Sequence, residues 1–310
     1  MQPNHWRLLR TVAAILFVAF AVGIVAGQWD DVRRATANIE ISWSQIALAT
    51  GIVFVAYALL IETWRRTVAA WGDKLGWLDA ARIWFISNLG RYVPGKVWQI
   101  GAMGVMAEER GVSAIAATGS AIVVNIVSII AGVGVVVATG GRILARYAGE
   151  VAALAAVLVA ALVLLPLGVK LAVRLYKRIS GRELQFGALP PRALIVALVG
   201  TSAAWLLYGI AFRFFALAVG APPNAGLASY TAAYTFSYLL GYLVLLAPGG
   251  IGVREGALVA SMTQLGLASG GVATVVAVTS RLWLTALEVF PGVLLLAFGA
   301  SRRTAQPISE

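Results

Sequence analysis

The stretch GRYVPGKVWQIG, residues 90–101, breaks an otherwise apolar region with a Pro-Gly pair flanked by two cations. Proline removes a backbone N–H and glycine permits tight turns, so Pro94 and Gly95 predict a break in a helix. Arg91 and Lys96 place positive charge on either side of that break. Inside a membrane, unpaired backbone groups and free charges must face protein, water or a ligand.

The composition indicates that the surroundings of this stretch are a membrane. The 310 residues are 60% hydrophobic and 12% charged, whereas soluble domains average about 45–50% apolar and about 25% charged residues. We therefore predict an all-α polytopic membrane protein. With no cysteine and one histidine, the sequence excludes disulfides, thiol nucleophiles and His- or Cys-rich metal sites. We expect no metal and no cofactor.

The formal net charge of +11 does not indicate nucleic acid as a partner. The basic residues gather in a few loops beside apolar spans, as the preference of Lys and Arg for cytoplasmic loops requires. In that position they favour anionic lipid headgroups. We expect a membrane lipid as the ligand and no nucleic acid.

Six apolar runs are close to the roughly 20 residues that span a bilayer. They lie at 8–27, 44–64, 113–139, 151–169, 193–219 and 272–299. Two further apolar regions are interrupted, 80–108 at Pro94-Gly95 and 228–268 within APGGIGVRE, residues 247–255. The predicted fold has six full transmembrane helices plus two broken re-entrant hairpins.

The basic segments predict how the chain crosses the membrane. Segments 62–74 and 170–182 both belong in the cytoplasm, as does the N-terminus. They agree only if 80–108 enters and leaves on the cytoplasmic side. The C-terminus is cytoplasmic as well if 228–268 dips in from the opposite side.

This topology divides the chain into two halves of opposite orientation. Segments 1–145 and 146–310 each contain two helices, a hairpin and a helix, which is the inverted-repeat plan of many transporters. In the alternative, 228–247 and 251–268 both span fully, which gives eight helices and one re-entrant hairpin. The sequence does not indicate an oligomeric state.

The charges at membrane depth form the candidate site. Each cation there costs roughly 2.5–3.5 kcal/mol if left bare, and nearby glutamates can offset part of this cost. After each break the new half-helix begins with a cation, and helix N-termini bind anions, which predicts a phosphate site. The candidate substrate-binding residues are Arg91, Pro94, Gly95, Lys96, Pro248, Gly249, Gly250, Gly252, Arg254, Glu255, Arg281 and Glu288.

Two plainer interpretations of these residues stay open. The first break can be a surface loop whose cations reach the lipid headgroups. Arg281 and Glu288, about two turns apart on one helix face, can be a structural pair. The GxxxG spacings at Gly23/Gly27, Gly252/Gly256 and Gly266/Gly270 allow close helix packing and have no functional specificity.

Three stretches carry a resemblance to a known family: GRYVPGKVWQ at 90–99, AEERGVS at 107–113 and APGGIGVREG at 247–256. The chain resembles, over nearly its whole length, the lysylphosphatidylglycerol synthase transmembrane family of flippase-like proteins. It is similar to the flippase portion of the multiple peptide resistance factor, without that protein's aminoacyl-transfer domain. The resemblance implies a multi-pass protein of the bacterial inner membrane and assigns no catalytic residue here.

The expected function is a lipid flippase that moves a phosphate-bearing lipid through a polar cleft between the two hairpins. Its substrate would be an anionic phospholipid or a polyprenyl-phosphate-linked sugar. Two alternatives stay open. One is an intramembrane enzyme that acts on a lipid-linked donor. The other is a non-transporting scaffold for a cell-envelope glycosyltransferase or synthase.

Overall fold

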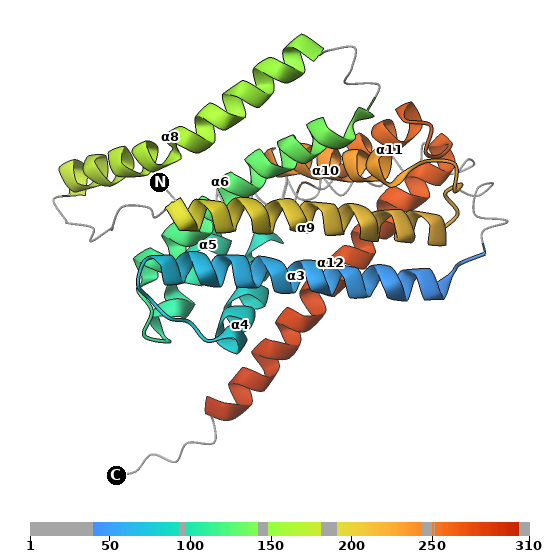
Figure 1. Cartoon of the computed structure of the whole chain (residues 1–310). Coiled ribbons are helices and arrows are strands. Elements are labelled where there is room, and N and C mark those ends of the chain that lie inside the picture. The colour runs from blue at the N-terminus through green and yellow to red at the C-terminus, as the bar shows by residue number, and fades with distance from the viewer. Residues whose placement is uncertain are drawn as a thin grey trace, which may run out of the picture.

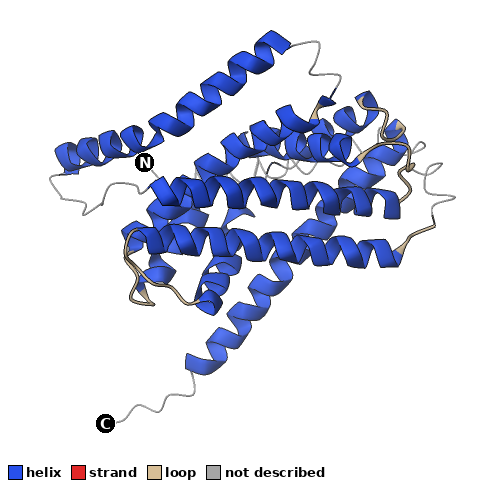
Figure 2. Cartoon of the chain, viewed as in Figure 1, coloured by secondary structure: helices blue, strands red, loops and turns tan. Residues whose placement is uncertain are grey.

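The computed structural model describes residues 40–92, 97–141, 148–180, 191–243, 250 and 252–303. Within these ranges the chain forms α-helices and one 3₁₀ helix joined by turns, with no strand (Figure 2). The predicted all-α fold is confirmed. The helix predicted at 8–27 lies outside the described residues.

Among the described residues, four helices are long and apolar enough to cross a membrane. They are α3 (Trp43–Ala70), α6 (Ala114–Thr139), α9 (Pro191–Ala218) and the segment Gly270–Leu296 of α12 (Gly270–Arg303). At about 1.5 Å of rise per residue each is about 40 Å long, more than the ~30 Å of a hydrocarbon core. The predicted runs 44–64, 113–139, 193–219 and 272–299 are thus confirmed as apolar helices of spanning length.

The predicted run 151–169 lies in a further long helix, α8 (Ala148–Ser180). Its apolar stretch, Ala156–Leu171, is shorter than the four spans. In Figure 1, α8 runs along one side of the bundle, nearest to α6.

The two regions predicted to be interrupted each contain two short helices. These are α4 (Trp77–Asn88) and α5 (Val97–Glu108), then α10 (Leu227–Leu243) and α11 (Val253–Gln264). A 3₁₀ helix, η1 (Leu89–Tyr92), follows α4. With 12 or 17 residues, these helices extend about 18–26 Å, less than a hydrocarbon core. The re-entrant path, its alternative and the repeats 1–145 and 146–310 stay predictions.

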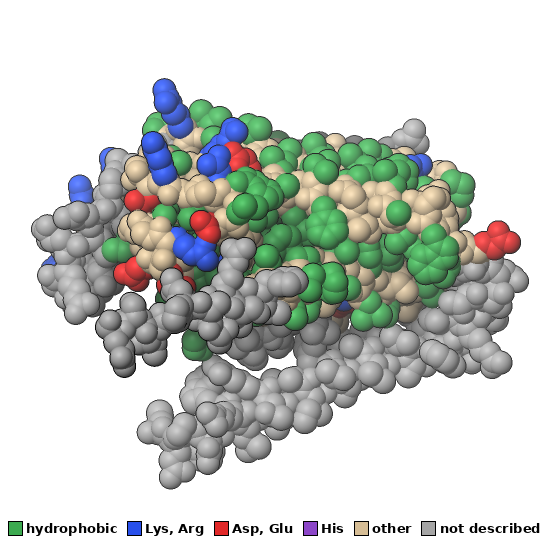
Figure 3. Space-filling view, turned by 90° about the horizontal axis from the view of Figure 1, so that it is seen from below, with side chains coloured by type: hydrophobic (Ala, Val, Ile, Leu, Met, Phe, Trp, Pro, Cys, Tyr) green, Lys and Arg blue, Asp and Glu red, His purple; other side chains and the backbone are tan. Residues whose placement is uncertain are grey.

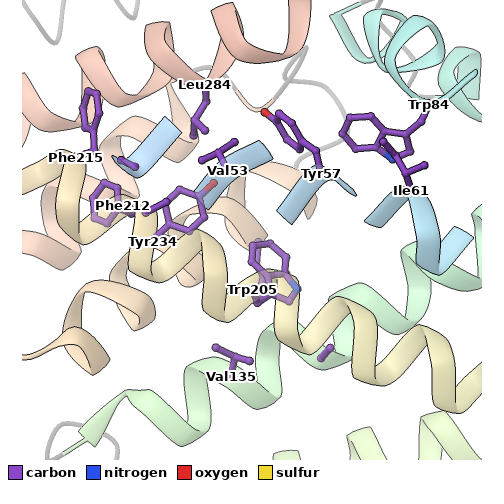
Figure 4. Close-up of a cluster of buried hydrophobic side chains, with 14 of the residues drawn as sticks. Val53, Tyr57, Ile61, Trp84, Val135, Trp205, Phe212, Phe215, Tyr234 and Leu284 are labelled. Carbon is purple, nitrogen blue, oxygen red and sulfur yellow. The ribbon is translucent and has the colours of Figure 1, made fainter. Parts of the chain in front are cut away.

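Aromatic side chains fill the centre of the bundle (Figure 4). Tyr57 of α3 lies against Trp84 of α4, with ring centroids 5.1 Å apart. Phe212 of α9 lies against Tyr234 of α10, with centroids 5.2 Å apart. Aromatic pairs of this kind contribute about 0.5–1.5 kcal/mol beyond their area burial. The core therefore ties both interrupted regions to α3 and α9.

Glycines allow α9 to lie close to its neighbours. A β-carbon added at Gly200 would clash with Oγ1 of Thr63 in α3, and one added at Gly209 would clash with Oγ1 of Thr231 in α10. Small residues at such crossings bring helix backbones together, which is how membrane helices gain packing contacts.

The GxxxG spacings did not identify these crossings. Among the described residues, nothing lies within 4 Å of a β-carbon added at Gly256, Gly266 or Gly270. A spacing that allows close packing therefore produces it only where a second helix faces the glycines.

Charged side chains gather at one end of the molecule. In Figure 1 the last turns of α3 and α8 and the first turn of α9 lie at the same side of the molecule. The basic segments 62–74 and 170–180 are therefore at that side. There Glu62 pairs with Arg65 and Arg66 at 2.8 and 2.6 Å. The face in Figure 3 shows most of its charged side chains toward this end and hydrophobic side chains over most of the remainder.

Both interrupted regions bring backbone against backbone. A β-carbon added at Gly90 would lie 3.0 Å from the backbone nitrogen of Gln99. One added at Gly250 would lie 2.5 Å from the carbonyl oxygen of Gly241, and Gly250 has a φ of +71°. The second crossing therefore requires glycine both for space and for its backbone conformation.

We expect Gly250→Ala to lower the free energy of unfolding by about 2 kcal/mol or more. A left-handed φ costs an alanine roughly 1–2 kcal/mol, and its β-carbon would also meet the carbonyl of Gly241. Thermal unfolding in detergent micelles, followed by circular dichroism, measures the change. The control is Gly134→Ala in α6, where the added carbon meets open space. A Gly250 variant that melts at or above the control would contradict the tight crossing.

Candidate functional site

A cavity lies where the two interrupted regions meet. Its walls come from η1 and α5 of the first region, α10 and α11 of the second, and from α6 and α12. Its volume is about 60 Å³, enough for several water molecules. We call it the charged cavity. Its lining residues are Arg91, Gln99, Ile100, Asn125, Tyr238, Gly241, Tyr242, Arg254, Arg281, Leu284, Thr285 and Glu288.

Arg254 is the most deeply buried cation of this cavity. The residue is only 6% exposed, and its guanidinium carbon lies 4.6 Å from the ring centroid of Tyr238 and 5.3 Å from that of Tyr234. The rings stabilise the charge by cation–π attraction. Its Nη2 atom has no hydrogen-bond partner among the described residues. A buried guanidinium N–H in this position is suited to an anionic oxygen.

Two ion pairs connect the interrupted regions to α12. In the first region, Nη1 of Arg91 lies 2.7 Å from Oε1 of Glu288 and 3.4 Å from the hydroxyl of Tyr238. In the second region, Oε1 of Glu255 lies 3.6 Å from Nε of Arg281. Arg281 and Glu288 both line the cavity, as expected for side chains about two turns apart. One helix thus presents a cation to one region and an anion to the other.

The start of α11 is capped by its own side chain. Glu255 accepts a hydrogen bond from the backbone N–H of Gly252, whose φ is +77°. This occupies one donor of the helix N-terminus that the sequence assigned to a phosphate. The phosphate site at this N-terminus stays a prediction, and Nη2 of Arg254 in the same helix turn is a further donor without a hydrogen-bond partner among the described residues.

A second cavity of about 110 Å³ adjoins the first and holds three amide side chains. We call it the amide cavity. Asn88 accepts a hydrogen bond from Gln99, and Asn125 accepts one from the hydroxyl of Tyr242 at 3.1 Å. The rest of its wall is mainly apolar and aromatic and includes Trp84 and Trp205 of the core (Figure 4). The two cavities share Arg91, Gln99, Asn125, Tyr238, Tyr242 and Glu288.

Four of the predicted site residues line the charged cavity directly. They are Arg91, Arg254, Arg281 and Glu288, while Glu255 contacts Arg281, and Gly250 and Gly252 precede α11. The interpretation of the first break as a surface loop is not tested, because the break itself is not described. The predicted residues outside the described part are Pro94, Gly95, Lys96, Pro248 and Gly249.

Sequence reasoning missed the uncharged part of the site. Tyrosines recur every fourth residue along α10, at Tyr230, Tyr234, Tyr238 and Tyr242. This spacing places them on one helix face, and it was the signal that could have identified the wall of both cavities. Asn125, an amide inside the apolar span α6, was a second signal.

The fold and its cavities define a class of protein: a polytopic helical membrane protein with two interrupted helical regions around a buried charged site. In the described part of the chain, no group of three His, Cys, Asp or Glu side chains could hold a metal. The family model named lysylphosphatidylglycerol synthase TM region matches residues 7–292. The chain belongs to this membrane-protein family, which points to a lipid-related function. No curated protein matches the chain.

A double-mutant cycle tests the pair between Arg91 and Glu288. We expect a coupling energy of about 1–3 kcal/mol between Arg91→Gln and Glu288→Gln, because either single change removes this ion-pair contact from a mostly buried charged partner. Thermal unfolding of the two single variants and the double variant measures it. The control cycle uses Glu62 and Arg66, whose arginine is 63% exposed, with a coupling below about 1 kcal/mol. Equal couplings in both cycles would refute the buried pair.

Proposed function

We propose that the protein is a lipid translocase of the inner membrane. A phosphate-bearing lipid would place its headgroup in the charged cavity while its hydrocarbon chains stay in the bilayer. Family membership supports a lipid as the substrate. No catalytic role is assigned to any residue in this proposal.

The observation that carries the proposal is the unpartnered Nη2 of Arg254 in a cavity built by both interrupted regions. A buried donor without an acceptor is unfavourable, and more so when it carries charge. A phosphate oxygen supplies the missing acceptor and a compensating charge. The rings of Tyr234 and Tyr238, whose centroids lie 5.3 and 4.6 Å from the guanidinium carbon, would hold Arg254 in place to receive that oxygen.

The charge balance of the site favours an anionic ligand. Three arginines, Arg91, Arg254 and Arg281, stand against two glutamates, Glu255 and Glu288, in the described part of the site. One phosphodiester carries a single negative charge and would balance this excess. Both anionic phospholipids and prenyl-phosphate-linked sugars meet this requirement.

The proposed translocation uses alternating access, in which the cavity opens to one side of the membrane at a time. In the proposal, segments 1–145 and 146–310 are inverted repeats, and their hairpins enter from opposite sides and meet at the cavity. Rocking of one repeat against the other would then open the cavity to each side in turn. The ion pairs to α12 would keep each hairpin in position during this motion.

Arg254→Gln tests the proposal in proteoliposomes. We expect the movement of a tail-labelled anionic phospholipid between leaflets to slow by about tenfold or more. The reason is that a hydrogen bond to a charged group contributes about 1.5–3 kcal/mol, and each ~1.4 kcal/mol is a factor of ten. Chemical quenching of the outer-leaflet label measures the rate.

Arg66→Gln is the matched control, because it removes an arginine at the charged end, outside both cavities. Gel filtration and thermal melting confirm that both variants fold. Equal rates for Arg254→Gln and wild type would count against the site. Mass spectrometry of the recovered lipids separates movement from chemistry, since a new product would replace the translocase with an enzyme.

A further inference from the structure

The amide cavity offers chemistry that a phosphate site does not need. The only charged side chains among its described lining residues are Arg91 and Glu288, which pair with each other. An ammonium headgroup entering it would meet a carboxylate already engaged by an arginine. An uncharged ligand that both donates and accepts hydrogen bonds fits better, since amides and hydroxyls do both.

Asn88 gives the strongest indication that this cavity holds a ligand. The residue is 1% exposed, and its Oδ1 accepts a hydrogen bond from Gln99. Its Nδ2 has no partner among the described residues and lies in the cavity wall. Buried donors in native proteins are almost always paired, so this N–H is suited to an oxygen of a ligand or of a bound water.

Asn125 and Tyr242 add a second, partly engaged polar pair. Nδ2 of Asn125 donates to the carbonyl of Ala121 at 2.8 Å, and its Oδ1 accepts from the hydroxyl of Tyr242 at 3.1 Å. An amide oxygen has two lone pairs, so Oδ1 of Asn125 can accept a second hydrogen bond, from a hydroxyl group of a ligand.

Indole rings also line the amide cavity. Nε1 of Trp64 donates to the carbonyl of Ala117 at 3.2 Å, and Nε1 of Trp205 donates to the carbonyl of Ser128 at 2.9 Å. Both rings are thus held in place with an apolar face available. Polyols and sugars combine hydroxyl groups with C–H faces, so amides and fixed aromatic rings together match their chemistry.

The position of the amide cavity relates it to the phosphate site. Its shared wall with the charged cavity includes Gln99, Tyr238 and Tyr242. A substituent on a phosphate held by Arg254 would therefore extend toward Asn88 and Asn125. The volume of about 110 Å³ accommodates a group the size of several water molecules.

We infer that the amide cavity binds the hydroxyl groups of an uncharged polyol or sugar attached to the phosphate that Arg254 binds. The inference rests on the proposed translocase function and specifies its substrate class. The shared chemistry is a hydroxylated group on a phosphodiester, which occurs in glycerophospholipids and in prenyl-phosphate-linked sugars.

Three labelled lipids in proteoliposomes of the full chain test it. Phosphatidylglycerol and phosphatidylmethanol carry the same charge and tails, but only the first has headgroup hydroxyls. A short-chain prenyl phosphate hexose is the third. We expect wild type to move phosphatidylglycerol or the hexose lipid about tenfold faster than phosphatidylmethanol. Whichever of the two moves faster identifies the source of the hydroxylated group.

Asn88→Ala should bring that rate ratio close to one, and the control Asn224→Ala, in an exposed loop, should preserve it. Equal wild-type rates for all three lipids would overturn the hydroxyl subsite and leave the translocase standing. A ratio that Asn88→Ala does not change would overturn it as well, leaving water as the partner of Asn88. Movement of none of the lipids by folded protein would overturn the translocase and this inference together.

Discussion

Two opposite charges on α12 hold the site together. Burying a lone charge is costly, and breaking a buried pair by removing one partner is strongly destabilising. Arg281 faces Glu255 of the second interrupted region, and Glu288 faces Arg91 of the first. The first region contributes the cation of its pair and the second region contributes the anion. Exchanging the two regions on α12 would therefore bring like charges together. This pairing holds η1 and the start of α11 against one helix, and among the described cations of the charged cavity it leaves Arg254 without a salt bridge.

Packing around these pairs determines the shape of the two cavities. The close crossing of Gly241 and Gly250 brings the first turn of α11 onto α10, and Arg254 then lies over the tyrosine face of that helix. The same face supplies Tyr238 to Arg91 and Tyr242 to Asn125. The tyrosine face of α10 therefore lines both the charged cavity and the amide cavity.

The sequence predicted those features that single residues or short runs determine. Apolar runs predicted the long helices because length and hydrophobicity decide membrane insertion, and the Pro-Gly pairs marked the regions built from short helices. Charges in apolar surroundings predicted Arg254 and its neighbours. The partners could not be predicted, since Arg91 and Glu288 lie 197 positions apart in the chain. The amide cavity was missed because its side chains come from separate elements. The GxxxG spacings did not identify the close crossings at Gly200 and Gly209, because spacing does not reveal which helix faces a glycine.

The excess of one cation in the described charged site has an electrical consequence. Moving one elementary charge across a membrane changes the free energy by about 2.3 kcal/mol per 100 mV. With the described residues alone counted, a site loaded with a monoanionic headgroup would be neutral and would cross the field without electrical work. The empty site would carry its positive charge during the return. In the proposed cycle, the transmembrane voltage would therefore act on the unloaded step and leave the lipid-bearing step unaffected.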